Sequence, residues 1–179
     1  IEGVSSLALE FAILTAARTN EVIGATWDEI DTYKSLWIIP ANRMKAGREH
    51  RVHLSRRALE ILKVLHEQKQ SSYVFPGKRE SKPLSNMALL MTLRRMKRND
   101  LTAHGFRSTF RDWASEVSMY PQEVAEMALA HTVADKVEAA YRRGDLLQKR
   151  RQLMEDWARY CETVSTCRDV IPINIKNIA

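Results

Sequence analysis

Cysteine is scarce in this sequence, and long apolar runs are absent. The two cysteines, Cys161 and Cys167, are too few and too close to the C-terminus to form a disulfide framework, and no further Cys/His cluster completes a zinc site. No apolar stretch approaches the length that crosses a bilayer, and the N-terminus lacks the basic and apolar regions of a signal peptide. These absences argue against a disulfide-stapled secreted protein and against a membrane protein, and we expect free thiols in the cytosol.

Acidic residues are the minority among the charged ones. Lys and Arg number 28 against 22 Asp and Glu, and the pI is ≈ 9.5. A basic balance of this kind suits a polyanionic partner, and nucleic acid is the first candidate. The 179 residues fit one domain, and 45% hydrophobic residues are enough for a core. Because the chain starts at Ile1 without a methionine and helical patterning begins almost at once, we expect a fragment of a longer protein.

The spacing of apolar residues predicts an α+β domain that is mainly α-helical with a small antiparallel β-sheet. Short β-type runs at residues 36–39 and 51–54, separated by a turn with glycine, predict a hairpin. Elsewhere apolar residues recur at helical spacing behind Ser, Pro or Asp residues that suit a helix start. The predicted helices cover residues 5–17, 55–68, about 85–96, about 104–117, 121–128, 135–143 and 145–164.

The helix near residues 104–117 combines packing with a candidate binding edge. Its predicted buried stripe consists of Phe106, Phe110, Trp113 and Val117. His104 and Arg107 fall together near its start, where free backbone N–H groups and the helix dipole favour an anion such as a phosphate. The alternative is that Arg107 extends to solvent from a core helix while His104 only caps it.

Two other positions place charge beside predicted packing. Arg18 follows the first helix, and burying an arginine is costly unless an anion meets it. Glu21 could orient Arg18, although an ordinary salt bridge at a helix end remains an alternative. Lys45 lies at the predicted hairpin tip among other basic residues, either as part of a solvated loop or to enter a DNA groove. These basic neighbours are Arg43, Arg48 and Arg51.

Metal binding is not predicted at the hairpin. His50 and His53 are separated by a spacing that places them on opposite faces of a strand, so they cannot form a metal-binding pair.

The polar residues that interrupt packing suit phosphodiester chemistry. Two arginines can clamp the non-bridging oxygens of a phosphodiester through bidentate hydrogen bonds and offset the charge that grows at phosphorus. A tyrosine can attack that phosphorus, but its hydroxyl has a pKa of about 10 and needs a base or a positive field. A lysine can protonate the departing 5′ oxygen. The candidate catalytic residues are Arg18, Lys45, His104, Arg107, His131 and Tyr141.

This ordered set resembles the catalytic domain of the tyrosine recombinases, most closely the bacteriophage and prophage integrases. The resemblance runs from about Leu7 to Cys161. It rests on residues 17–21 (Ala-Arg-Thr-Asn-Glu), on the hairpin residues 44–47 (Met-Lys-Ala-Gly), on residues 104–107 (His-Gly-Phe-Arg), on residues 129–131 (Leu-Ala-His) and on Tyr141. Each piece alone is weak, whereas the set in this order is specific.

The resemblance implies a domain that breaks and rejoins DNA strands without a metal ion or other cofactor. It implies that Arg18 and Arg107 bind the scissile phosphate, that His104 acts as acid or base, and that Lys45 protonates the leaving oxygen. It further implies that His131 hydrogen-bonds the phosphate and that Tyr141 forms a covalent 3′-phosphotyrosine. Since that ester keeps the bond energy, a 5′ hydroxyl from another duplex can reverse the step, which is recombination.

Family members also suggest partners and domain limits. We expect double-stranded DNA carrying attachment sites, a homotetramer on DNA that is a monomer or dimer without it, and accessory DNA-bending or excisionase proteins. We expect residues 1–179 to be the catalytic domain without the N-terminal DNA-binding domains, residues 165–179 to be a C-terminal tail, and the location to be the bacterial cytoplasm at the nucleoid. The expected DNA-backbone contacts are Arg43, Arg48, Arg142 and Arg143.

Three other functions remain open at this point. A type IB topoisomerase uses nearly the same residues but relaxes supercoils as a monomer. A non-catalytic DNA-binding domain would keep the basic faces without needing Tyr141. A metal-dependent nuclease is disfavoured because the sequence shows no carboxylate cluster.

Overall fold

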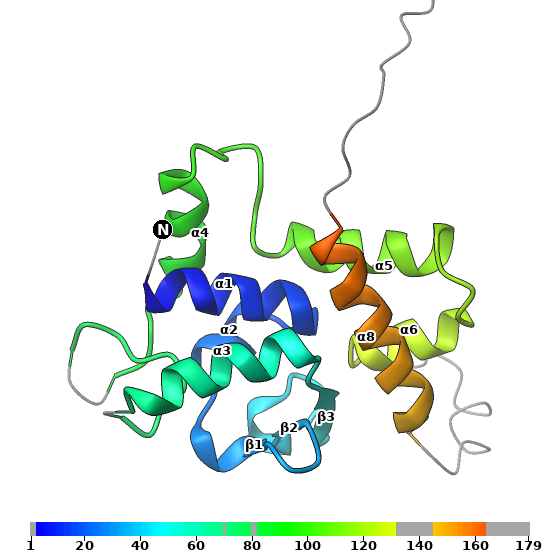
Figure 1. Ribbon diagram of the computed structural model, residues 1–179, viewed down its shortest axis with the longest axis horizontal. Coiled ribbons are helices and arrows are strands. Elements are labelled where there is room, and N and C mark those ends of the chain that lie inside the picture. The colour runs from blue at the N-terminus through cyan, green and yellow to red at the C-terminus, as the bar shows by residue number, and fades with distance from the viewer. Residues whose placement is uncertain (1–2, 70, 80–81, 132–144, 164–179) are drawn as a thin grey trace, which may run out of the picture.

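A computed structural model describes residues 3–69, 71–79, 82–131 and 145–163 of the chain (Figure 1). Helices predominate, and three short strands form one antiparallel sheet in the order β1-β2-β3. The predicted α+β class is therefore confirmed. The helices are α1 (Val4–Thr15), α2 (Thr19–Ile23), α3 (Arg56–Glu67), α4 (Ala88–Arg95), α5 (Gly105–Glu116), α6 (Gln122–Ala128) and α8 (Leu147–Glu162), with short 3₁₀ turns η1 (Trp27–Glu29) and η2 (Ala41–Arg43).

The predicted hairpin is present and slightly displaced. Strand β2 (Leu36–Ile39) pairs with β3 (His50–His53), and Trp37 lies opposite Val52. A further strand, β1 (Ile30–Asp31), extends the sheet on the other side of β2. Gly47 in the connecting loop has φ +62°, a backbone conformation that favours glycine, as the predicted turn requires.

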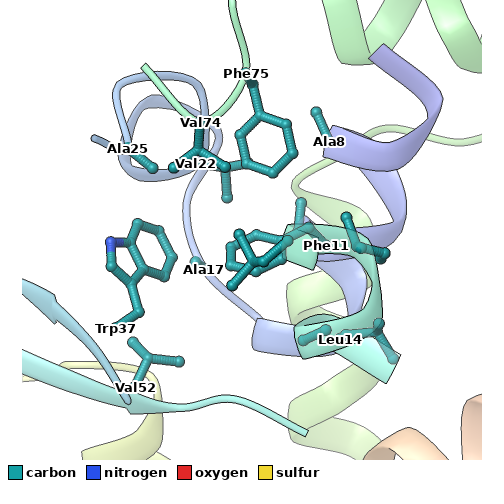
Figure 2. Packing of buried hydrophobic residues seen from close by; sticks show 14 of the residues in the cluster. Ala8, Phe11, Leu14, Ala17, Val22, Ala25, Trp37, Val52, Val74 and Phe75 are labelled. Carbon is teal, nitrogen blue, oxygen red and sulfur yellow. The ribbon is translucent and has the colours of Figure 1, made fainter. Parts of the chain in front are cut away.

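The main core surrounds α1, which α3 and α4 cover. Figure 2 shows Phe11 of α1 beside Trp37 of β2 and near Phe75, with ring centroids 5.4 and 5.3 Å from that of Phe11. All three side chains are completely buried. The apolar residues on nearly every side of α1 are explained by this central position.

A second core joins α5, α6 and α8, which lie together at one end of the molecule (Figure 1). Trp157 of α8 packs against Phe110 and Trp113 of α5, with centroid distances of 5.4 and 5.2 Å. Its indole Nε1–H donates to the carbonyl of Ile13 at 2.8 Å and so ties α8 to α1. Helix α8 therefore packs on its own chain.

Two polar contacts attach α8 to the sheet as well. His53 of β3 lies 2.9 Å from Glu155, and buried Arg150 donates to the carbonyl of Arg51. His50 instead contacts the carbonyl of Ala128 at the end of α6. The two histidines therefore have different partners, in keeping with the predicted opposite faces.

Several predicted details are wrong. Val117 is 62% exposed because α5 ends at Glu116 and the chain turns away, with the Ser118 amide donating to the Trp113 carbonyl. The helix predicted over about 85–96 is shorter at its end, since α4 stops at Arg95 and Met96 is half exposed. The start predicted at about residue 85 is also early, since α4 begins three residues later at Ala88.

Some predictions fall where the structure gives no description. Three predicted parts lie outside the described residues: the helix over residues 135–143, Val164 at the end of the helix over 145–164, and the tail 165–179. Among the helices that are described, none has the length and apolar character needed to cross a membrane.

Candidate active site

Arg18 lies where α1 turns into α2. Helix α1 ends at Thr15, and the capping residue Ala16 has a left-handed φ of 48°. Arg18 then occupies the position before the first residue of α2. The carboxylate of Glu21 accepts hydrogen bonds from the Arg18 backbone N–H and from Nη1, both at 2.8 Å. Glu21 is buried, while the Arg18 side chain keeps 29% of its surface exposed. The predicted salt bridge thus exists, and it holds a guanidinium that solvent can still reach.

Arg107 lies in the first turn of α5 and is buried, with 6% of its surface exposed. Its Nη1 donates to the carbonyl of Ala16 and its Nη2 to the carbonyl of Leu129. It therefore links the end of α1, beside Arg18, to the end of α6. The alternative in which Arg107 extends to solvent is therefore not what the structure shows.

The two arginines form a positively charged centre. Burial and the nearby positive charge of Arg18 together lower the pKa of Arg107 to about 10, against the opposing effect of Glu21 and Glu126. Among the described residues Arg107 has no ion pair, because its hydrogen-bond acceptors are neutral carbonyl groups. A buried cation without an anionic partner is costly, and an anion that reaches it would be bound favourably.

His131 lies two residues after Leu129, whose carbonyl accepts a hydrogen bond from Arg107. Its Nδ1 lies 2.5 Å from Oε2 of Glu126, and its backbone N–H donates to the Glu126 carbonyl at 3.0 Å. The other carboxylate oxygen of Glu126 accepts from Nε of Arg111 on α5 at 2.8 Å. Glu126 and Arg111 were not singled out from the sequence. The only signal was the helical register that places Glu126 one turn and a half before His131.

His104 stands immediately before α5 and is exposed. Its carbonyl accepts from the Arg107 backbone N–H at 3.0 Å, but its imidazole makes no capping hydrogen bond. The hydroxyl of Thr102 takes that role by accepting from the Gly105 N–H at 3.0 Å. The imidazole is thus not used as a cap and lies on the surface one turn from Arg107.

Lys45 is exposed in the loop between η2 and β3, next to buried Met44. The structure therefore brings together Arg18, Arg107 and, through the α6 end, His131, and it leaves Lys45 on a separate loop.

The predicted DNA-contacting arginines differ in their surroundings. Arg43 is paired with Glu29, and its Nη2 donates to the Glu21 carbonyl at 2.7 Å, so its guanidinium braces the segment that holds Arg18. Arg48 is exposed in the loop that carries Lys45. Arg142 and Arg143 lie outside the described residues. A DNA contact of these residues stays a prediction, and Arg43 would have to make it with a side chain already bound to protein.

Tyr141 also lies outside the described residues, yet both flanks of its segment are anchored. On one side stands His131, held by Glu126. On the other side Asp145 pairs with Arg51 of β3 at 2.6 Å and accepts from the Leu147 N–H at the start of α8. The described residues contain no group of three or more His, Cys, Asp or Glu side chains placed to hold a metal ion.

Comparison with known proteins gives consistent relatives. Residues 2–146 match the phage integrase family. The chain is 38% identical over 149 residues to prophage integrase IntA of Escherichia coli (strain K12), covering 82% of this chain and 36% of that protein. It is 36% identical to prophage integrase IntZ of the same strain, covering 88% and 39%, and 32% identical to the integrase of Enterobacteria phage P4, covering 89% and 40%.

Solved structures share the fold. The lambda integrase catalytic core matches with a TM-score of 0.54 at 21% identity, covering 74% of this chain and 82% of that one. A lambda integrase tetramer bound to a Holliday junction matches with a TM-score of 0.56 at 18% identity, covering 75% and 43%. The chain spans about two fifths of the length of the curated relatives it matches. The family match extends over most of the sequence and includes every residue of the candidate site, and the chain belongs to the phage integrase family, the tyrosine recombinases of phages and prophages.

Proposed function

We propose that this chain is the catalytic domain of a site-specific DNA recombinase that cleaves and rejoins strands through a 3′-phosphotyrosine. The observation that carries this proposal is the paired cationic centre, in which buried Arg107 has no ion pair in the described structure and lies beside partly exposed Arg18. A phosphodiester supplies the anion that such a centre binds, in a form that two guanidinium groups can clamp.

The reaction follows from these roles. The Tyr141 oxygen forms a bond to phosphorus as the bond from phosphorus to the 5′ oxygen breaks. Arg18 and Arg107 stabilise the negative charge that accumulates on the non-bridging oxygens. His104 accepts or returns the tyrosine proton, and Lys45 gives a proton to the departing 5′ oxygen.

His131 hydrogen-bonds the same phosphate, and rejoining is the reverse reaction. A 5′ hydroxyl, from the same or another duplex, attacks the phosphotyrosine and displaces Tyr141. No metal ion or other cofactor enters this sequence of steps, because the leaving group is protonated by a side chain and the charge is met by arginines.

The partners are double-stranded DNA attachment sites and further copies of the protein. Relatives of the same fold have been solved as a lambda integrase dimer bound to a core site and as a tetramer bound to a Holliday junction. By this likeness we assign a homotetramer on DNA, integration or excision of a prophage with accessory DNA-bending or excisionase proteins, and a location at the nucleoid in the bacterial cytoplasm.

A nicked suicide substrate tests the nucleophile. We expect wild-type protein to form a covalent protein–DNA adduct that maps to the peptide containing Tyr141 and that persists in EDTA. Tyr141→Phe should keep DNA affinity while losing the adduct, because only the attacking hydroxyl is removed. Tyr33→Phe is the matched control, since Tyr33 is 96% exposed and far from the site in sequence.

The other outcomes each assign a different function. An adduct that persists in Tyr141→Phe would place the nucleophile on another residue. A wild-type protein that binds DNA without forming any adduct would mean a non-catalytic binding domain. Plasmid relaxation without recombination between two sites would mean topoisomerase activity instead.

A further inference from the structure

Glu126 joins two elements that carry candidate catalytic residues. It lies near the end of α6, and its carboxylate contacts His131 with one oxygen and Arg111 of α5 with the other, at 2.5 and 2.8 Å. Its negative charge also acts on Arg107. Its side chain is 23% exposed, so these contacts are partly shielded from water. None of the roles assigned above uses this carboxylate.

The charge of Glu126 fixes which ring nitrogen of His131 bears a proton. Burial alone would raise the pKa of Glu126, but the hydrogen bonds from His131 and Arg111 outweigh it and lower that pKa below the ordinary value. An ionised carboxylate can only accept hydrogen bonds. The Nδ1 atom of His131 must therefore be the donor in this contact, which leaves Nε2 on the opposite side of the ring for another partner.

We propose that Glu126 is a positioning residue of the strand-cleavage reaction, which orients the imidazole of His131 so that Nε2 meets a non-bridging oxygen of the scissile phosphate. This inference rests on the proposed function, because it needs a phosphate at the site. Arg111 holds the second carboxylate oxygen and prevents Glu126 from turning away.

The arrangement also explains how His131 can donate to an anion. With Nδ1–H donated to Glu126, a hydrogen bond from Nε2 to the phosphate requires a proton on Nε2 as well. The resulting imidazolium lies between two anions, the carboxylate and the phosphate, and each stabilises it. Without Glu126 the ring could rotate or carry its single proton on either nitrogen.

Single-turnover cleavage of the suicide substrate by the 179-residue chain tests this role. We expect Glu126→Ala to lower the cleavage rate about 10- to 100-fold, the equivalent of losing one charge-assisted hydrogen bond, with DNA affinity changed less than about threefold. Glu126→Gln should recover most of the rate because its amide oxygen still accepts from Nδ1–H. Glu116→Ala is the control, because Glu116 is exposed on α5 and its replacement removes the same negative charge.

A double-mutant comparison separates positioning from general stabilisation. If Glu126 acts through His131, then Glu126→Ala combined with His131→Ala should cleave no more slowly than His131→Ala alone. The proposal would be overturned if Glu126→Ala slowed cleavage as much in the His131→Ala background as it does in the wild-type protein. A wild-type cleavage rate in Glu126→Ala alone would overturn it too. If instead wild-type protein forms no adduct at all, the proposed function fails.

A measurement on the unaltered protein avoids any folding defect of the variants. The ¹⁵N shifts of the His131 imidazole, assigned by comparison with His131→Ala, should show a proton on Nδ1 at neutral pH. A ring protonated only on Nε2 would overturn the proposal whether or not the protein cleaves DNA, since Glu126 would then have no proton to accept.

Discussion

Replacing Trp157 by alanine should destabilise this chain strongly. Trp157 is 2% exposed, its ring packs against Phe110, Trp113 and Tyr160, and its Nε1–H donates to the Ile13 carbonyl at 2.8 Å. These contacts attach α8, which follows the segment of Tyr141, to α5 and α1. The variant therefore tests whether α8 is part of the domain's own core.

The expected magnitude comes from the loss of a buried indole. Truncating a buried tryptophan to alanine costs about 3–5 kcal/mol through lost burial and the cavity that remains. The lost hydrogen bond adds little, because the Ile13 carbonyl also accepts from the Ala16 N–H at 3.2 Å and keeps a partner. For a chain of this size the loss corresponds to a fall in Tm of roughly 6–20 °C.

Urea unfolding at two protein concentrations, tenfold apart, measures this effect. We expect Trp157→Ala to lower the free energy of unfolding by the stated amount at both concentrations. Met119→Ala is the control, since Met119 is 98% exposed and its truncation should change stability by less than about 0.5 kcal/mol. A loss under 1 kcal/mol for Trp157→Ala, or wild-type stability that rises with concentration, would mean that α8 packs on another copy.

Two further predictions concern charge. Arg18→Lys and Arg107→Lys should each lower suicide-substrate cleavage by about 10²- to 10³-fold, because an ammonium cannot form the bidentate clamp; wild-type rates in both would show that neither contacts the phosphate. Burial lowers the pKa of His50 from 6.5 to about 4, so the folded protein keeps this ring neutral where the unfolded chain takes up a proton. The stabilisation that the neutral His50 ring contributes is then fully present above pH 6.5, and the free energy of unfolding falls by about 3 kcal/mol as the pH drops to 4. Urea titrations at several pH values should find this loss missing in a folded His50→Asn variant. An unchanged pH dependence in that variant would contradict this assignment.

The regular elements were largely predictable because their signals are local. Ala58, Ile61, Leu62 and Leu65 recur at helical spacing and are buried on α3, and Ser55 caps that helix by accepting from the Ala58 N–H at 3.4 Å. The helix ends that were predicted wrongly depend on tertiary contacts. Nothing in the sequence near Val117 tells that α5 stops and the chain turns, and strand β1 is too short to leave a pattern.

The chemistry of the site could be predicted from the sequence, whereas the contacts that hold its side chains in place could not. Residues such as Arg18 and Arg107 stood out because charge interrupts apolar sequence, and their order along the chain matched a known family. Glu126 could not stand out in this way, because a glutamate on a helix is ordinary until the fold shows what it faces. The acceptors of Arg107 are backbone carbonyls, which carry no side-chain signal at all.

The contacts of Arg107 explain why an arginine is needed at this position. A guanidinium has N–H groups on three nitrogens, and Arg107 uses one N–H from Nη1 and one from Nη2 to hold the carbonyls of Ala16 and Leu129. The remaining N–H groups can still bind an anion, so the residue assembles the site and charges it at once. A lysine carries its three N–H donors on a single nitrogen, so it cannot span the two carbonyls and still present a planar pair of donors to an anion. The cost of burying this cation without an ion pair among the described residues is one that a bound DNA phosphate would offset.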